Sequence, residues 1–446
     1  MDRTLLLAGA LLLAAGCSAP PPAAFGDRRD DWRAQEARFL PPSAAPELSG
    51  SPDLAELWAA AQRGNPGLRA AFHRWRAEME SVPLATSLPD PRLSLAGYLS
   101  QVETRVGPMQ GRIGLSQAFP WFGSLQAAGD QAFAASEAAR EDFEAARTRL
   151  RQSLADSWFE LHYLERAVAV TEGHQELLRH LEAVSRSRYE TARGEHADLI
   201  RAQVELGQVE DQLSTLRDLK RPLVERLNAA LGRPVGSLLA WPDGLSPAPA
   251  SLPADLAAGM ARSSPELRAL DARAEAARHG IVLAEKDFYP GFSLGADWTW
   301  IGDSPMAGVP DSGQDALALV VGIDLPVRRG RLDAGLSRAR AREAAVLAQR
   351  EDLQLRLNAE LEMALYRYRD AQRRVTLYRD GLVAKSEQSF QSTLTAYQAA
   401  AMPFDSVVDS ARLLLAFQLE LARAEVDRLQ AVAAAERFTG LVLLPF

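Results

Sequence analysis

The sequence contains one cysteine, Cys17, among 446 residues. No disulfide can therefore form within the chain, even in an oxidising compartment. Methionine is scarce, and the six histidines lack the spacing of a metal-ligand set, so we expect neither a metal site nor a cofactor. The sequence also lacks a nucleophile elbow, a phosphate-binding loop and a zinc-protease motif, and we expect no enzymatic activity.

The sequence also has a net negative charge and few long apolar runs. The net charge of −8 argues against a nucleic-acid partner, because such partners select a basic surface. No run of 18 apolar residues follows the N-terminal region, so the sequence predicts no transmembrane helix. Membrane β-strands alternate in polarity and score weakly on hydropathy, so this absence leaves a β-barrel open.

Proline is missing from two long stretches, residues 121–221 and 327–402. Both are rich in alanine, leucine, glutamate, arginine and glutamine, and their apolar residues recur at helical spacing. We predict two long helical hairpins, at about 123–231 and about 331–437. Gly194 suits a left-handed helix end in the first turn, and Pro403 ends the helix in the second. On the helices alone, a plain coiled-coil scaffold would explain the pattern equally well.

The chain repeats itself. Residues 65–70 return as 264–269 and residues 91–95 as 290–294, both 199 positions later. Further on, Tyr189 corresponds to Tyr397 at an offset of about 208, so the second copy has a longer loop near 301–317. The sequence predicts one helix–strand–strand–helix–helix unit present twice. The predicted boundaries are a first repeat at 52–231, a connector at 232–254, a second repeat at 255–438 and a tail at 439–446.

Each repeat contains two segments with alternating polarity. They lie at about 91–101, 111–119, 290–301 and 316–326. One apolar face, one polar face and a length near ten residues fit strands that cross a bilayer. Four strands cannot close a barrel, so we expect a homotrimer with a twelve-stranded β-barrel. Asp297 and Asp324 would then face its lumen. The alternative, a soluble β-sandwich, lacks a second sheet to cover the apolar face.

The N-terminus has the features of an export signal. Arg3 precedes a leucine-rich core and then small residues up to Cys17. We predict a lipoprotein signal peptide at 1–16, acylation of Cys17 and an extended, proline-rich tether at 17–51. An ordinary signal peptide with an unmodified cysteine is the alternative.

The segments at the ends of the strands carry a resemblance to a known family. Residues 115–123 (LSQAFPWFG) and 323–330 (IDLPVRRG) resemble the strand-to-helix junctions of outer-membrane efflux proteins, the TolC-like channels, and of heavy-metal-efflux members in particular. The resemblance implies a mainly α-helical trimer whose β-barrel continues as a long α-helical barrel across the periplasm. It also implies an outer-membrane location and two partners, a periplasmic adaptor and an inner-membrane resistance–nodulation–division pump.

The resemblance assigns roles to both hairpin turns. Members of the family contact the adaptor through these turns, which implies the following contact residues here: Tyr189, Gly194, Asp198, Leu199, Ala202, Tyr397 and Pro403. Relatives narrow the periplasmic end with aspartate rings, which implies a gate at Asp405 and Asp409. These two lie four residues apart at a helix start, so the alternative is that they complement the positive helix N-terminus.

The implied function is passive export of metal ions or small toxic molecules. The competing interpretation is a periplasmic adaptor or a structural coiled-coil lipoprotein, which also combines long hairpins with a lipid anchor. The sequence leaves the cargo open.

Overall fold

The computed structural model describes residues 18–39, 48, 50, 52–242, 244–245, 248–253 and 255–446. The predicted signal peptide at 1–16 and the predicted lipidation site at Cys17 lie outside these residues. Contacts divide the chain into two compact units. The first contains the described residues up to Ala34, His73–Arg140 and Ala269–Glu351. The second contains Gln35–Phe72, Glu141–Arg268 and Asp352–Phe446.

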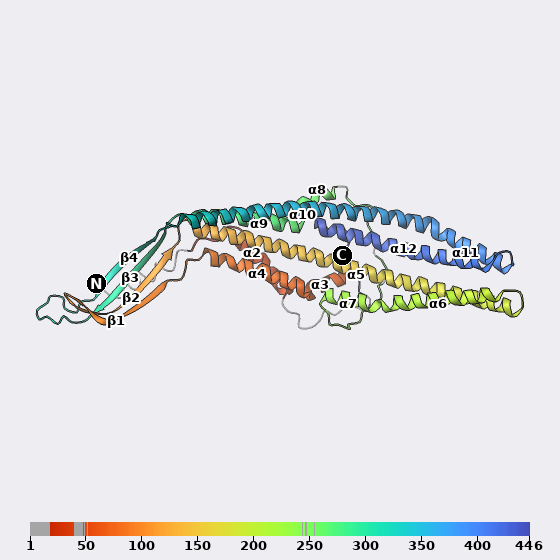
Figure 1. The fold of residues 1–446 in the computed structure, drawn as a ribbon, viewed down its shortest axis with the longest axis horizontal. Helices are drawn as coiled ribbons and strands as arrows, with labels where there is room; N and C mark the ends of the chain where they lie inside the picture. Colours follow the sequence, from red (N-terminus) through yellow and green to blue (C-terminus); the bar gives the residue numbers. More distant parts are fainter. Residues whose placement is uncertain are drawn as a thin grey trace. The chain divides into compact units, whose positions relative to one another are not determined.

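The first unit contains a four-stranded antiparallel sheet in the order β1-β2-β3-β4 (Figure 1). The strands are β1 (Arg92–Thr104), β2 (Gly107–Phe119), β3 (Gly291–Ile301) and β4 (Ala316–Asp324). The central pairing joins strands far apart in sequence, with Gly114 opposite Asp297. Within the described residues, β1 and β4 each pair on one side only, so both edges of the sheet remain available.

The sheet presents large apolar side chains to its surroundings. Leu99 and Leu319 are among the most exposed large apolar residues that the structure describes. Other exposed apolar residues at alternate positions of the two edge strands are Leu93, Leu95, Leu317, Val321 and Ile323. The predicted alternation is therefore present, and one apolar face of the sheet has no cover from the described residues of this chain.

The strand ends differ from the prediction in the first pair. The turn between β1 and β2 spans only residues 105–106, whereas a loop of about nine residues was expected. Gly107 permits this turn because its φ is +137° and a Cβ there would lie 1.7 Å from the carbonyl oxygen of Gly302. The loop between β3 and β4 covers residues 302–315, so the longer second loop is as expected.

The first helix in the described residues is α2 (Phe25–Phe39), which belongs to the first unit up to Ala34. The prediction of an extended tether is wrong for these residues. Prolines flank the segment but are absent from it, and Trp32 is buried with the Arg76 guanidinium 4.8 Å from its ring. Cation–π contact and burial of the indole favour the helix over an extended chain. Arg76 belongs to α4 (Pro66–Thr86), whose counterpart in the second half is α9 (Pro265–Lys286).

The first long helical hairpin consists of α5 (Ser124–Glu190), α6 (His196–Asp218) and α7 (Lys220–Leu231). The 67 residues of α5 are uninterrupted, as the absence of proline predicts. A short break at Leu219 separates α6 from α7, and Gly232 ends α7 with a φ of +71°. The predicted connector after this point has no helix or strand among its described residues.

The second hairpin contains a π-helical turn, which the first hairpin lacks. It consists of α10 (Arg329–Leu377), a π-helical turn η1 (Tyr378–Leu382), α11 (Val383–Gln398) and α12 (Phe404–Thr439). The element order of the first half therefore recurs, with α3 (Leu54–Gly64) and α8 (Leu256–Ser263) as its short leading helices.

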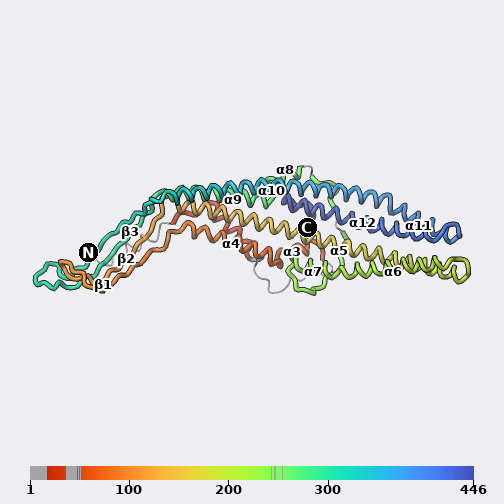
Figure 2. Tube along the Cα trace, viewed as in Figure 1, coloured from red at the N-terminus to blue at the C-terminus, as the bar shows by residue number. Residues whose placement is uncertain are grey.

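The second unit has its main apolar core where these helices meet the short ones. Leu57, Leu161, Leu227, Leu231 and Val432 are fully buried there. A second cluster lies nearer the hairpin turns, and both turns are at the same end of this unit (Figures 1 and 2). Among the described residues, no helix is both long and apolar enough to cross a membrane.

Candidate functional site at the hairpin tips

The two hairpin turns have the same backbone geometry. We call residues 185–202 the first tip and residues 393–412 the second tip. In the first, the Arg193 amide donates to Arg188 O over 2.8 Å and Ala192 has a φ of +56°. In the second, the Ala401 amide donates to Ala396 O over 2.8 Å and Ala400 has a φ of +57°. Both helices therefore end in a Schellman motif, with alanine in the left-handed position that glycine usually occupies.

Gly194 does not take the left-handed conformation predicted for it. Ala192 takes that conformation, two residues earlier. Gly194 is needed instead for a close approach, because a Cβ there would lie 2.9 Å from Cβ of Arg188. In the second tip the corresponding stretch contains Pro403, which is exposed and immediately precedes α12. The prediction that Pro403 ends the helix is wrong, because α11 already ends at Gln398 and Pro403 is the N-cap of α12.

Tyr397 joins the two tips. Its side chain is 3% exposed, and its ring centroid lies 5.4 Å from that of Phe404. The hydroxyl is 3.4 Å from Oδ2 of Asp198 and 3.5 Å from Oγ of Ser185, both in the first tip. Arg188 lies over the ring at 4.6 Å, and its Nη1 donates to Tyr397 O over 2.8 Å. Burial raises the pKa of the Tyr397 hydroxyl, which therefore remains protonated and able to donate.

Tyr189 occupies the equivalent position of the first tip, but its environment is different. Its side chain is 45% exposed, and its ring lies 5.1 Å from the imidazole of His196. His196 in turn corresponds to Phe404 at the same offset of 208. Equivalent aromatic pairs are therefore buried at the second tip and exposed at the first.

The other predicted contact residues of the first tip lie between the hairpins. Ala202 and Leu199 are buried, and Ala202 packs in an apolar cluster with residues of α5, α11 and α12. Asp198 is partly buried, and this burial raises the pKa of its carboxyl above the usual value, while the hydrogen bond from Tyr397 opposes the shift. Leu199 and Ala202 thus support the tips from inside, whereas Tyr189 and Pro403 are exposed.

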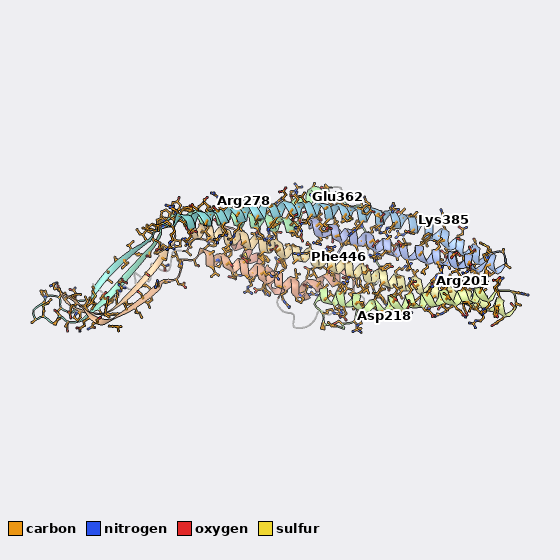
Figure 3. The ribbon with its side chains drawn as sticks, viewed as in Figure 1. Arg201, Asp218, Arg278, Glu362, Lys385 and Phe446 are labelled. Atoms are coloured by element: carbon orange, nitrogen blue, oxygen red, sulfur yellow. The ribbon has the colours of Figure 1, made fainter. Side chains whose placement is uncertain are left out.

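The predicted gate aspartates lie on the first turns of α12. Asp405 forms an ion pair with Arg201 of α6, which is labelled close to the tips in Figure 3. Asp409 is more exposed, and its carboxylate is 3.9 Å from Nη1 of Arg412. The carboxylates therefore differ, because Asp405 is paired with the first hairpin and Asp409 is exposed with a weak partner.

One ion pair beside the gate residues was missed by the sequence analysis. Nε of Arg412 donates to Oε2 of Glu205 over 2.8 Å, and the Glu205 side chain is buried. His174 is also buried nearby, and this burial lowers the pKa of its imidazole despite the charge of Glu205. Glu205 lies on α6 at helical spacing from Arg201, which could have indicated a charged seam between α6 and α12.

The strand aspartates predicted to line a lumen lie in the sheet of the first unit. Oδ2 of Asp297 is 3.5 Å from Nη1 of Arg112 on the neighbouring strand. Gly114 leaves room for the carboxylate, since a Cβ at that position would lie 2.1 Å from Oδ1 of Asp297. Asp324 is exposed at the end of β4, opposite Gly291.

The strand-to-helix junction of the first half is built around Trp121. Its ring stacks on Tyr289 at 4.9 Å and lies 5.8 Å from Phe292. Gly123 takes a φ of +80°, so the turn into α5 needs a glycine. Across the described residues, no group of three or more His, Cys, Asp or Glu side chains could hold a metal ion.

Comparison with known proteins identifies the class to which this fold belongs. The sequence profile of the outer membrane efflux protein family matches residues 57–233 and 259–441. The chain therefore belongs to this family, the TolC-like channels, and is an outer-membrane efflux channel of a Gram-negative bacterium.

Individual relatives agree with this assignment. The chain is 25% identical over 470 residues to the pyoverdine export outer membrane protein OpmQ of Pseudomonas putida, covering 99% of this chain and 97% of the relative. Its fold is similar to that of the outer membrane protein VceC of Vibrio cholerae, with a TM-score of 0.73, 20% identity and coverage of 87% and 96%. It is also similar to the channel-forming protein CusC, with a TM-score of 0.75, 18% identity and coverage of 90% and 98%.

Proposed function

We propose that the protein is the passive exit duct of a tripartite efflux system. In this proposal three copies assemble, their twelve strands close a β-barrel in the outer membrane, and their hairpins form an α-helical barrel in the periplasm. Each of the two repeats contributes one strand pair and one hairpin, so the duct is built from similar units. Cys17, if acylated, adds a lipid anchor after removal of residues 1–16.

One observation carries this proposal. Among the residues that the structure describes, the sheet has two open edges and an uncovered apolar face. Open edges and exposed leucines are costly in water, and unpaired backbone groups are costly in lipid. Closure by two further copies satisfies both requirements at once, because each β4 edge pairs with a β1 edge and the apolar face meets lipid.

The tips are the proposed contact region for the periplasmic adaptor, which would connect the duct to a resistance–nodulation–division pump. Tyr189, His196 and Pro403 supply its exposed surface, while Tyr397, Leu199 and Ala202 support it from within. Asp405 and Asp409 of three copies would place six carboxylates around one opening. Such a ring attracts cations and repels anions through its focused negative potential.

Conductance in a planar lipid bilayer tests the channel and its gate together. The purified protein should produce unitary conductance steps, and replacing both gate aspartates (Asp405→Asn with Asp409→Asn) should reduce cation preference. Asp211→Asn on the exposed surface of α6 is the matched control and should change neither property. Absence of steps, or equal effects of the gate and control variants, would reject the proposed roles.

Two classes of cargo fit the observations. The junction segments resemble those of heavy-metal-efflux members, which favours metal ions. The relative OpmQ is named for pyoverdine export, which favours pyoverdine as the second class of cargo. A deletion strain should separate the two classes, since loss of metal tolerance would support the first and intracellular retention of pyoverdine the second.

A further inference from the structure

The second long helix contains one residue more than the first. Gly123 corresponds to Gly330 at an offset of 207, but Tyr189 corresponds to Tyr397 at an offset of 208. Buried positions show the same change. The pairs Leu154–Leu361 and Leu164–Ala371 differ by 207, whereas Leu178 and Ser386 differ by 208. The additional residue therefore lies between Ala371 and Ser386.

The π-helical turn η1 lies within this interval. The amide of Val383 donates to Tyr378 O, five residues back rather than four. The corresponding part of α5 is regular α-helix. A single extra residue in a long helix can be accommodated by one widened turn, which leaves the helix on both sides intact. We therefore attribute the change of offset to η1.

The residues around η1 constrain its conformation only weakly. None of its five residues is buried. A Cβ on Gly381 would meet nothing within 4 Å, so the glycine is not required by close packing. Glycine at an open helical position costs stability without a steric need, and widened turns often occur where helices bend. The contacts to α12 are the ion pair of Arg379 with Glu425 and the approach of Tyr378 and Phe417, whose ring centroids are 5.6 Å apart.

The first hairpin provides a matched comparison. Gly173 corresponds to Gly381 at the offset of 208 and likewise has open space around its Cβ position. Arg217, the counterpart of Glu425, forms a similar pair between helices with Glu172 over 2.7 Å. The glycine and an ion pair between helices are thus alike in the two hairpins at this level. The differences are the π-helical turn and burial, since Thr171 and His174 are buried whereas no residue of η1 is.

We propose that η1 is the hinge of the second hairpin. About this hinge, α11 and the second tip move against α12 while α5 stays rigid. The 16 residues of α11 place its last turn, which belongs to the second tip, about 24 Å from η1, so a small change at η1 displaces that turn appreciably. The coupling of this motion to opening near Asp405 and Asp409 rests on the proposed channel function; the flexing itself does not.

Hydrogen–deuterium exchange of the full-length protein in detergent tests the flexing. Amides of residues 379–383 should exchange faster than those of 171–175. Gly381→Ala should slow exchange at 379–383 about fivefold, which is the helix propensity difference expressed as an equilibrium ratio. Arg379→Ala should accelerate it. Equal exchange in the two wild-type segments would overturn the proposal.

Bilayer conductance of the same proteins tests the coupling. Gly381→Ala should lower the open fraction and Arg379→Ala should raise it, whereas the matched variants Gly173→Ala and Arg217→Ala should leave it unchanged. Equal changes from both glycine variants, or none from Gly381→Ala, would overturn a coupled role for η1. If the wild type does not conduct at all, the channel proposal fails, and exchange alone still decides whether η1 flexes.

Discussion

The two hairpin tips have the same backbone turn but place their tyrosines in different environments. Both close through a Schellman motif with alanine in the left-handed position, and both place a tyrosine three residues before it. At the second tip the tyrosine is buried against Phe404, Asp198 and Arg188. At the first tip Tyr189 stays exposed beside His196. A repeated motif thus provides both a structural contact within one chain and a surface available to other chains.

Removing the tyrosines should show this difference most strongly. Tyr397→Ala leaves a cavity between the hairpins and should destabilise the tips by about 3–5 kcal/mol. Tyr189→Ala removes an exposed ring and should cost less than about 1 kcal/mol. Hydrogen exchange of α11 and α6 amides reports both values. Similar losses from the two variants would contradict the assignment of different roles.

A buried carboxyl should make the two long helices respond differently to pH. Burial raises the pKa of Asp156 in α5 from 3.8 to about 7, and its counterpart in α10 is Met363. The folded state therefore retains a proton that the unfolded state loses, so the contribution of Asp156 to stability is greatest below about pH 4 and falls as pH rises towards 7. Between pH 5 and pH 8 the loss should be about 2–3 kcal/mol.

Asp156→Asn should remove this part of the pH dependence. Denaturant unfolding of the extracted protein at the two pH values measures it. A variant with the same pH slope as the wild type would show that other groups cause the slope.

The two ion pairs between α6 and α12 should also differ in strength. Arg412→Ala leaves Glu205 buried without its cation, and we expect a loss of about 2 kcal/mol, reduced from the fully buried case because Arg412 is half exposed. Arg201→Ala disrupts a pair with two exposed partners and should cost less than about 1 kcal/mol. The midpoint of thermal unfolding in detergent ranks them, and the reverse order would refute this interpretation.

The smallest expected effect concerns the left-handed alanine that both tips contain. Ala192→Gly and Ala400→Gly relieve the left-handed strain of a Cβ and should each stabilise their turn by about 0.5–1 kcal/mol. Thermal unfolding should shift by the same amount for both. A clear difference between them would mean that the two turns are not equivalent in energy.

The sequence predicted the elements better than the contacts between them. Absence of proline located α5, and alternating polarity located the four strands, because both signals depend on local periodicity. The helix α2 was missed because the prolines flanking Phe25–Phe39 suggested an extended chain. The turn η1 was missed because an additional residue changes only the offset between repeats, from 207 to 208.

At the candidate site, Tyr397 and Asp405 were selected from the family resemblance, but their partners were not. Arg188 and Arg201 contact the opposite hairpin, and such contacts depend on how the hairpins pack rather than on local spacing. The exposure of the tip side chains was likewise not predictable from the sequence. Leu199 is apolar and Tyr189 is aromatic, yet Leu199 is buried and Tyr189 is exposed.

The trimeric channel is the central claim, and the mass of the detergent-extracted protein, by light scattering corrected for bound detergent, tests it most directly. Wild-type and Cys17→Ser proteins should be compared, so that a lipid anchor cannot account for the detergent requirement. We predict that both run as trimers and that both require detergent. A Cys17→Ser protein that is monomeric and remains in solution without detergent would contradict the trimeric channel.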